Sequence, residues 1–304
     1  MSDEPIDAVT GAFSYTGGAI ARQLLNRGHT VRTLTSHPNR AGADKRIEPH
    51  PLSFDQPREL AASLAGVSTL YNTYWIRFSR GNNTFDQAVE NSAILFRAAR
   101  DAGVERIVHV SVTNPSIDSP FPYFRGKASI EGQLAEIHES WAVVRPTVIF
   151  GPGDILMNNI AWLLRRFPVF AIPGDGSYRL RPVHVDDVGR LCADLGAADT
   201  NEIIDSVGPE TFTFDELVET IRQAVGARSK LVHVPPRLAM LGASAAGVLV
   251  RDVILTDHEM GGMMAEVAFS SGSTTGRQRF GEWLASESST LGRAYSSELA
   301  RHFR

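Results

Sequence analysis

Tyr123 and Lys127 are the residues of this 304-residue sequence whose types and spacing most clearly suggest chemistry. The chain has only three lysines and six tyrosines, so a lysine four residues after a tyrosine is rarely a coincidence. Residues four apart on a helix share a face, which directs the phenol and the ammonium the same way. A nearby ammonium lowers a tyrosine pKa from about 10 toward neutrality. The pattern therefore predicts a phenol that exchanges protons with a carbonyl or an alcohol.

Two hydroxyl residues stand shortly before this pair. The segment 106–111, with the sequence RIVHVS, is apolar and β-branched and predicts a strand. Its end carries Ser111, and Thr113 follows two residues later. A hydroxyl at a strand end can orient the oxygen of a substrate. Both residues suit this role, and the sequence does not choose between them.

A glycine-rich segment near the N-terminus predicts a dinucleotide site. Residues 10–18 read TGAFSYTGG, between a predicted strand at 7–10 and a predicted helix at 17–27. Gly11 and Gly17 take the first and third positions of a dinucleotide-binding glycine pattern, while Ser14 replaces the usual second glycine. Such a turn brings the pyrophosphate to the amides of a helix N-terminus. The expected cofactor contacts are Gly11, Ser14, Tyr15, Thr16 and Gly17.

The end of the second predicted strand favours NADP over NAD. An acidic residue about 20 positions after the turn would bind the ribose 2′-hydroxyl of NAD, and none precedes Asp44. Ser36 and Arg40 supply instead a hydroxyl and a guanidinium that suit a 2′-phosphate. NAD stays the alternative cofactor, and Lys127 adds an expected contact to the nicotinamide ribose.

Strands and helices alternate through the first half of the chain. We expect strands at 7–10, 31–34, 49–54, 69–74, 106–111 and 141–144, and helices at 17–27, 59–65, 85–102 and 123–139. This alternation predicts an α/β fold with a doubly wound parallel Rossmann sheet. Residues 1–153, rejoined by 181–206, are expected to form the cofactor-binding domain. Residues 154–180 and 207–304 are expected to form a smaller, mostly helical substrate-side region, without strands across 151–182.

Composition narrows the class of protein. A net charge of −4 and a pI near 6.1 argue against nucleic acid as a partner. The N-terminus shows no signal-peptide pattern, and the one cysteine, Cys192, excludes an intrachain disulfide. The longest apolar run, 238–250, is too short to span a membrane and predicts a segment packed inside the protein. We therefore expect a cytoplasmic monomer or homodimer that acts on a small molecule.

One group of polar residues invites comparison with a metal site. His184, Asp186 and Asp187 stand close together, but no companion ligands follow at a familiar spacing. The aspartates are expected instead to stabilise the start of a helix at 188–195 through its dipole. We therefore predict no metal.

Together these segments resemble the extended and atypical short-chain dehydrogenases/reductases, a superfamily that includes nucleotide-sugar epimerases and NmrA-like proteins. The resemblance rests on TGAFSYTGG (10–18), HVSVTN (109–114), YFRGK (123–127), RPTVIFGPGD (145–154) and RPVHVDDV (181–188). The last two segments are similar to those of proteins related to the NADPH-binding subunit of respiratory complex I.

The resemblance also implies roles for particular residues. It makes Tyr123 the catalytic acid/base, with Lys127 as its partner and ribose ligand. Ser111 or Thr113 would be the assisting hydroxyl. The adenine contact would fall on Asp55, and the stretch beneath the cofactor on Asn72 and Thr73.

The sequence thus predicts an NADP-dependent oxidoreductase that moves a hydride between the nicotinamide and a carbonyl or alcohol. The apolar, methionine-rich C-terminal region favours a hydrophobic or aromatic substrate over a charged sugar nucleotide. One alternative is a nucleotide-sugar epimerase or dehydratase with a tightly bound cofactor. Another is a non-catalytic NADP(H)-binding protein that serves as a redox sensor or assembly subunit.

Overall fold

The chain folds into two compact units, each with its own hydrophobic core. The computed structural model describes residues 5–39 and 44–302, so the predicted phosphate contact Arg40 lies outside the described residues. The first unit comprises Met1–Pro146 with Val185–Ser206, and the second Thr147–His184 with Val207–Arg304.

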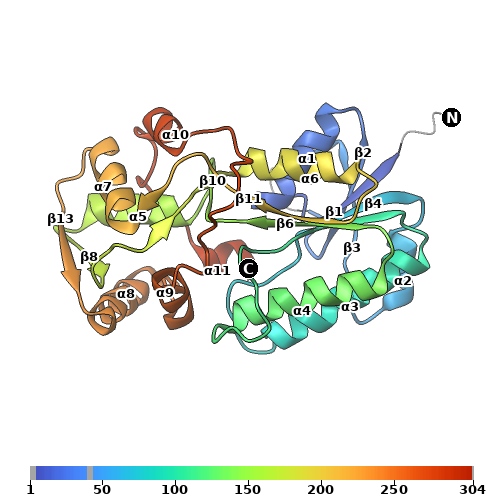
Figure 1. Cartoon of the computed structure of the whole chain (residues 1–304), viewed down its shortest axis with the longest axis horizontal. Helices are drawn as coiled ribbons and strands as arrows, with labels where there is room; N and C mark the ends of the chain where they lie inside the picture. The colour runs from blue at the N-terminus through green and yellow to red at the C-terminus, as the bar shows by residue number, and fades with distance from the viewer. Residues whose placement is uncertain (1–4, 40–43, 303–304) are drawn as a thin grey trace. The chain divides into compact units, whose positions relative to one another are not determined.

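A seven-stranded parallel sheet forms the centre of the first unit (Figure 1). Its strands are β1 (Ile6–Thr10), β2 (Thr30–Thr35), β3 (Ile47–Pro51), β4 (Val67–Asn72), β5 (Arg106–Val110), β6 (Trp141–Pro146) and β11 (Glu202–Ser206). They lie in the order β11-β6-β5-β4-β1-β2-β3. The order therefore reverses between β1 and β4, which confirms the predicted doubly wound Rossmann fold.

Helices cover both faces of this sheet. They are α1 (Tyr15–Asn26), α2 (Pro57–Ser63), α3 (Phe85–Asp101), α4 (Pro122–Ile137) and α6 (Val185–Gly196). Figure 1 shows α1 and α6 on one face, and α2, α3 and α4 on the other. A Cβ at Gly189 would lie 2.8 Å from the carbonyl of Ala19, so the close approach of α6 to α1 requires glycine there.

The predicted elements of this unit are all present, with small shifts at their ends. The largest shift is in the third strand, predicted at 49–54 and found at Ile47–Pro51. Its extent follows from its neighbour, because Val31 of β2 pairs with Ile47 and Thr35 pairs with Pro51. The strand therefore begins and ends where β2 offers hydrogen-bond partners.

The second unit combines short strand pairs with helices. Its strands are β7 (Ile149–Phe150), β8 (Val169–Pro173), β9 (Arg179–Leu180), β10 (Val183–His184), β12 (Phe212–Thr213) and β13 (Lys230–Val234). Its helices are α5 (Leu156–Arg166), α7 (Phe214–Ala224), α8 (Pro236–Val250), α9 (Asp257–Met264), α10 (Phe280–Glu287) and α11 (Glu298–His302). The core between them is strongly aromatic: Phe150 lies 5.1 Å from Phe280 and 5.2 Å from Trp283, between ring centroids.

The expectation that 151–182 would lack strands is wrong. β8 pairs in parallel with β13, and β9 pairs with β12 in antiparallel. Both partners stand far along the chain, so a local pattern with several prolines and glycines could not reveal the pairing.

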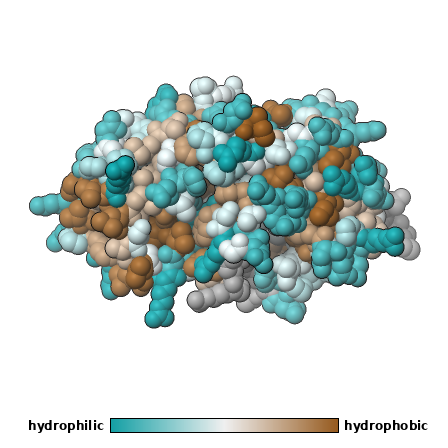
Figure 2. Space-filling view, turned by 90° about the horizontal axis from the view of Figure 1, so that it is seen from below, coloured by the Kyte–Doolittle hydropathy of each residue, from teal (hydrophilic) through white to brown (hydrophobic). Residues whose placement is uncertain are grey.

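The expectation that 238–250 would pack inside the protein is also wrong. These residues form most of α8, in which Ala239 and Gly247 are buried while Leu238, Leu241, Val248 and Leu249 are exposed. Figure 2, seen from below the view of Figure 1, shows hydrophobic residues gathered on the part of the second unit where α8 lies. Within the described ranges, no helix is long and apolar enough to cross a membrane.

Candidate functional site

The carboxyl ends of β1 to β5 meet at one edge of the parallel sheet, and predicted site residues follow each strand there. They are Gly11 after β1, Ser36 after β2, Asp55 after β3, Asn72 and Thr73 at the end of β4, and Ser111 and Thr113 after β5. Ligands of open α/β sheets bind outside these ends, at the point where the strand order reverses. The fold thus brings the predicted groups to the edge where such sites occur.

The glycine-rich turn between β1 and α1 is tightly closed. Gly11 has φ +66°, a left-handed conformation that favours glycine, and its carbonyl accepts a hydrogen bond from the amide of Ser14 at 2.7 Å. A Cβ at Gly17 would lie 2.3 Å from that same carbonyl oxygen. No larger residue fits at Gly17 without opening the turn, so both glycines are required by its geometry.

Ser14 completes this turn. Its hydroxyl donates to the carbonyl of Gly11 at 2.6 Å, so the side chain closes the turn from within. Ser14 is also the N-cap of α1, and Tyr15, Thr16 and Gly17 form its first turn. The leading amides of a helix have no partner inside the helix, and they carry partial positive charge. The arrangement can therefore receive a phosphate, with a serine in the place of the usual second glycine.

The ends of β1 and β4 are joined by buried side-chain hydrogen bonds. Thr10 Oγ1 donates to Asn72 Oδ1 at 3.2 Å and accepts from the amide of Thr73 at 2.7 Å. Thr73 Oγ1 donates in turn to the carbonyl of Thr10 at 2.6 Å. These bonds hold the two strands together beside the glycine-rich turn, at the point where the strand order reverses. Asn72 and Thr73 therefore join the ends of β1 and β4 beside the predicted dinucleotide site.

His109 of β5 extends this network into the core. The amide of Tyr74 donates to Asn72 Oδ1 at 3.0 Å, which leaves the Asn72 NH2 group to face His109 Nδ1 at 3.1 Å. His109 Nδ1 must therefore accept, and the proton of the neutral ring lies on Nε2. Complete burial and the neighbouring Lys127 hold the pKa of His109 well below its usual value. His109 is thus a neutral, fixed imidazole.

The two candidate hydroxyls differ in their hydrogen bonds. Thr113 Oγ1 donates to the carbonyl of Pro146 at 2.9 Å, so its proton is already engaged with the backbone. Ser111 is buried, and its Oγ has no hydrogen-bond partner among the described residues. A buried hydroxyl without a partner is costly in free energy, and a bound ligand atom can relieve that cost.

Tyr123 lies in the first turn of α4 against an aromatic cluster. Its ring meets Trp75 and Phe85 edge-on, at centroid distances of 5.8 and 6.1 Å. Trp75 also lies across the backbone of α4, because a Cβ at Gly126 would come within 2.6 Å of the indole. The absence of a side chain at Gly126 thus allows Trp75 to cover the turn of α4 between Tyr123 and Lys127.

Lys127 is almost completely buried, with 2% of its surface exposed. Its Nζ donates to the carbonyl of Val110 at the end of β5, at 2.8 Å, and lies 4.9 Å from the centroid of the Trp75 ring. Burial lowers the pKa of Lys127 to about 7, although Glu131 one turn later raises it. Lys127 can therefore change its protonation state near neutral pH.

Glu131 is held by a partly buried arginine. Arg145 of β6 donates to Glu131 Oε1 through Nε at 3.0 Å and to the other carboxylate oxygen through its terminal nitrogen. The bidentate pair fixes the carboxylate beneath α4. Tyr123, Lys127 and Glu131 thus form a line at four-residue spacing along one helix face, passing from an aromatic surface to a partly buried ion pair.

Other predicted residues lie away from the buried residues around Lys127. Ser36 is exposed, and its Oγ contacts Nδ1 of the neighbouring His37 at 3.0 Å. Asp55 is exposed between β3 and α2. Neither contact with a cofactor is tested by the structure, and both stay predictions.

The acidic residues considered for a metal lie in the first turn of α6. Asp186 accepts a hydrogen bond from Arg22 at 2.6 Å, and Asp187 lies 3.5 Å from Arg190. In the described part of the chain, no group of three or more histidine, cysteine or acidic side chains is placed to hold a metal ion.

Three residues around Lys127 were given no role by the sequence analysis. His109 lies within the HVSVTN segment, but its burial shows only in the fold. Glu131 offered a signal, because it follows Lys127 at the same four-residue spacing that links Lys127 to Tyr123. Trp75 offered none, since its contact with α4 joins distant segments.

Known proteins share sequence features and the fold with this chain. The sequence model of the "NAD dependent epimerase/dehydratase family" matches residues 8–204. The chain is 23% identical to the mitochondrial "NADH dehydrogenase [ubiquinone] 1 alpha subcomplex subunit 9" of Arabidopsis thaliana over 266 residues, covering 82% of this chain and 65% of that protein. It is 25% identical to the "Ceramide reductase" of Caulobacter vibrioides, covering 80% of this chain and 76% of that protein.

A solved structure has the same fold over nearly the whole chain. The triphenylmethane reductase of Citrobacter sp., complexed with NADP(H), superimposes with a TM-score of 0.76 at 19% identity. The match covers 93% of this chain and 99% of the reductase.

Proposed function

Because this chain belongs to the NAD dependent epimerase/dehydratase family, we propose that it is an NADP-dependent oxidoreductase acting on a carbonyl or alcohol of a small apolar molecule. The observation that carries the proposal is Lys127, a buried lysine four residues after Tyr123 on α4. Burying a lysine costs free energy, which the hydrogen bond to Val110 and the attraction of Glu131 offset only in part. A role in proton transfer beside a phenol accounts for its presence.

In the proposed reaction, the bound cofactor supplies or accepts the hydride. Tyr123 donates its phenol proton to the substrate oxygen during reduction and takes a proton back during oxidation. The Lys127 ammonium stabilises the phenolate that remains, since both lie on one face of α4. The backbone carbonyl of Val110 and the carboxylate of Glu131 support the charged form of Lys127 against the cost of burial.

We assign the assisting hydroxyl to Ser111. Its Oγ is free to donate to a substrate oxygen, whereas Thr113 Oγ1 already donates to the carbonyl of Pro146. A hydrogen bond from Ser111 would polarise the carbonyl while Tyr123 delivers the proton.

The residues of the glycine-rich turn fit a dinucleotide. Gly11 and Gly17 allow the close backbone approach that a pyrophosphate requires, and the first turn of α1 offers its amides. Asn72 and Thr73 would support the cofactor from the end of β4. Ser36 and Arg40 would distinguish NADP from NAD.

An apolar substrate is supported by the aromatic surface around the phenol. Trp75 and Phe85 lie against Tyr123, and neither brings a charge to it. The relatives named a ceramide reductase and a triphenylmethane reductase also point to apolar substrates for this chain.

Two other functions have support of their own. The family includes epimerases and dehydratases, so tightly held cofactor with turnover in the absence of added NADPH would indicate that class.

The similarity to complex I subunits favours a non-catalytic binding protein. The chain spans only 65% and 63% of the two such subunits from Arabidopsis and Neurospora. Such a binder would have no need of the Tyr123 phenol.

The test is a panel of aromatic and aliphatic ketones and aldehydes with NADPH and with NADH, on the wild type and Tyr123→Phe. We expect turnover with NADPH, and a loss of about 10²–10⁴-fold in kcat for the variant, with cofactor binding retained in fluorescence titration. Tyr178→Phe, which removes a buried phenol in the core of the second unit, is the matched control.

Undiminished turnover in Tyr123→Phe would exclude the phenol as acid/base. Cofactor binding without turnover of any carbonyl would favour the non-catalytic alternative.

A further inference from the structure

Helix α8 buries small residues and exposes large apolar ones, which is the opposite of an ordinary surface helix. The two residues that it buries are small, Ala239 and Gly247, while four large aliphatic side chains face outward. Leu241 is 67% exposed, Val248 80% and Leu249 68%. These residues recur at spacings that place them on one side of a helix, together with Leu238. A contiguous apolar face of this kind marks a surface that contacts something other than water.

The apolar face continues onto the neighbouring strand pair. Val169 of β8 is 50% exposed, and Val232 of β13 is 40% exposed. β8 pairs with β13, and the chain passes from β13 into α8 after Pro235. Figure 2 shows the resulting gathering of hydrophobic residues. We call Val169, Val232, Leu238, Leu241, Val248 and Leu249 the α8 surface.

Cations border the α8 surface, and the segment that carries most of this surface contains no carboxylate. Arg237 and Arg251 are exposed at the two ends of α8, and Arg228 and Lys230 are exposed at the start of β13. No acidic residue occurs from Arg228 to Arg251, in a chain whose net charge is −4. The next carboxylate, Asp252, is buried and accepts hydrogen bonds from Tyr295 and from backbone amides.

We propose that the α8 surface docks on an anionic lipid bilayer. The outward leucines and valines would enter the boundary between headgroups and acyl chains, with α8 lying along the membrane plane. The arginines at its ends have long aliphatic stems, so their charged groups can reach lipid phosphates while the stems stay among the chains. Arg228 and Lys230 add attraction to negative headgroups.

The charge pattern favours a bilayer over a second copy of this chain. A twofold dimer through α8 pairs identical surfaces, so its cationic border would face another cationic border. Antiparallel helices would set Arg237 of one chain beside Arg251 of the other, with no carboxylate in either segment to separate them. An anionic membrane turns the same border into an attraction. The inference does not depend on the proposed reaction, because it uses residues of the second unit alone.

The test is sedimentation of the full chain with vesicles of phosphatidylcholine, with and without one third phosphatidylserine. We expect at least roughly tenfold stronger binding to the anionic vesicles, weakening as salt screens the charges. Changing Leu241, Val248 and Leu249 together to Ser should lower binding by more than about tenfold, because the apolar insertion is lost. Arg237→Gln with Arg251→Gln should lower binding to anionic vesicles by about fivefold per charge.

Matched controls use exposed residues of the first unit. Ile117→Ser with Ile203→Ser removes two exposed aliphatic side chains, and Arg100→Gln removes an exposed charge. All three should leave vesicle binding unchanged. Light scattering of the wild type and the triple serine variant reports the oligomeric state.

Two results would overturn the proposal. One is wild-type binding that is absent or insensitive to the triple serine change. The other is a wild-type dimer that this change dissociates, which would show that a second copy covers the α8 surface. Thermal unfolding of the variants verifies that each one is folded.

Discussion

Helices α4 and α8 both depart from the rule that charged side chains are exposed and large apolar ones are buried, and they do so in opposite ways. α4 buries the charged side chains of Lys127 and Glu131, whereas α8 exposes Leu241 and Leu249. In α4 both buried charges have partners, since the carbonyl of Val110 accepts a hydrogen bond from Lys127 and Arg145 forms an ion pair with Glu131. In α8 no described part of the chain covers the exposed leucines.

The contrast separates two kinds of functional surface. A buried charged side chain with hydrogen bonds from only part of its surroundings is suited to a chemical role, because its position is fixed before a substrate binds. An exposed apolar face is prepared for association, because its free energy is released only when water leaves it. The two helices should therefore respond differently to substitution.

The largest expected difference concerns leucines of the two helices. Leu134→Ala in α4 should lower the free energy of unfolding by about 2–5 kcal/mol, because Leu134 is fully buried and its removal leaves a cavity. Leu249→Ala in α8 should change it by less than about 0.5 kcal/mol without lipid. Urea unfolding followed by circular dichroism measures both. A similar cost at the two sites would mean that α8 is covered within the chain.

The second prediction concerns the buried lysine and pH. The pKa of Lys127 is about 7 in the folded chain and about 10.4 when unfolded, so the unfolded chain binds more protons between these values. Stability from this group therefore rises as pH increases from 7 to 10, and the cost of burial is complete below pH 7. Relative to Lys127→Met, the wild type should gain on the order of 3 kcal/mol across that window. Parallel unfolding curves for the two proteins would contradict the buried, shifted lysine.

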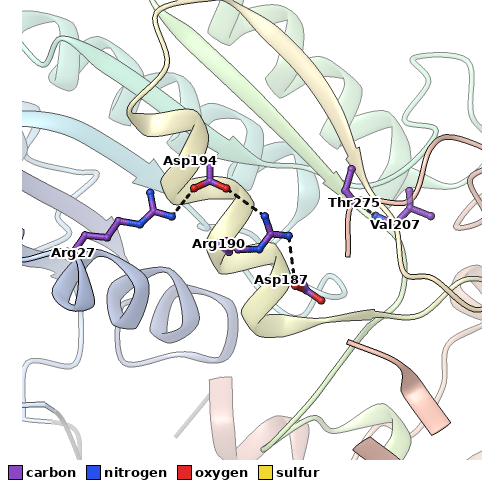
Figure 3. A network of polar contacts seen from close by, with 6 residues as sticks. All are labelled: Arg27, Asp187, Arg190, Asp194, Val207 and Thr275. Carbon is purple, nitrogen blue, oxygen red and sulfur yellow. Dashed lines mark hydrogen bonds and ion pairs between the residues drawn. The ribbon is translucent and has the colours of Figure 1, made fainter. Parts of the chain in front are cut away.

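The smallest expected effect concerns exposed charged residues, which are neither buried charges nor exposed apolar side chains. On α6, Asp194 receives hydrogen bonds from Arg27 at 2.6 Å and Arg190 at 3.3 Å, as Figure 3 shows. Asp194 is about half exposed, so solvent screens these contacts. Asp194→Asn should cost about 0.5 kcal/mol, decreasing at high salt. Thermal unfolding at low and high salt measures it, and a loss comparable to that of Leu134→Ala would refute this ranking.

The sequence predicted the first unit well because its signals are local. Strands such as β1 and β5 are short runs rich in apolar residues, and α1 and α3 end just before Gly28 and Gly103, both with positive φ. The second unit was predicted less well. β8 and β13 are distant in sequence, and pairing between distant strands leaves no local periodic pattern.

The candidate site divides in the same way. Tyr123 and Lys127 could be found from their spacing, and the glycine-rich turn from its position between a strand and a helix. Trp75 could not be found, because its place over Gly126 depends on how the loop after β4 meets α4. Our proposal of Ser111 over Thr113 likewise rests on a hydrogen bond from Thr113 to Pro146, which belongs to another strand.

The sequence by itself determined the fold class, the family and the pair of residues on which the proposed chemistry rests. These follow from order and spacing, which short-range physics converts into helices, strands and shared faces. Only the tertiary structure decided which groups are buried: the lysine that the spacing identified lies inside, and the apolar run 238–250 lies outside. Burial depends on every element packed around a residue, and no local segment of sequence contains that information.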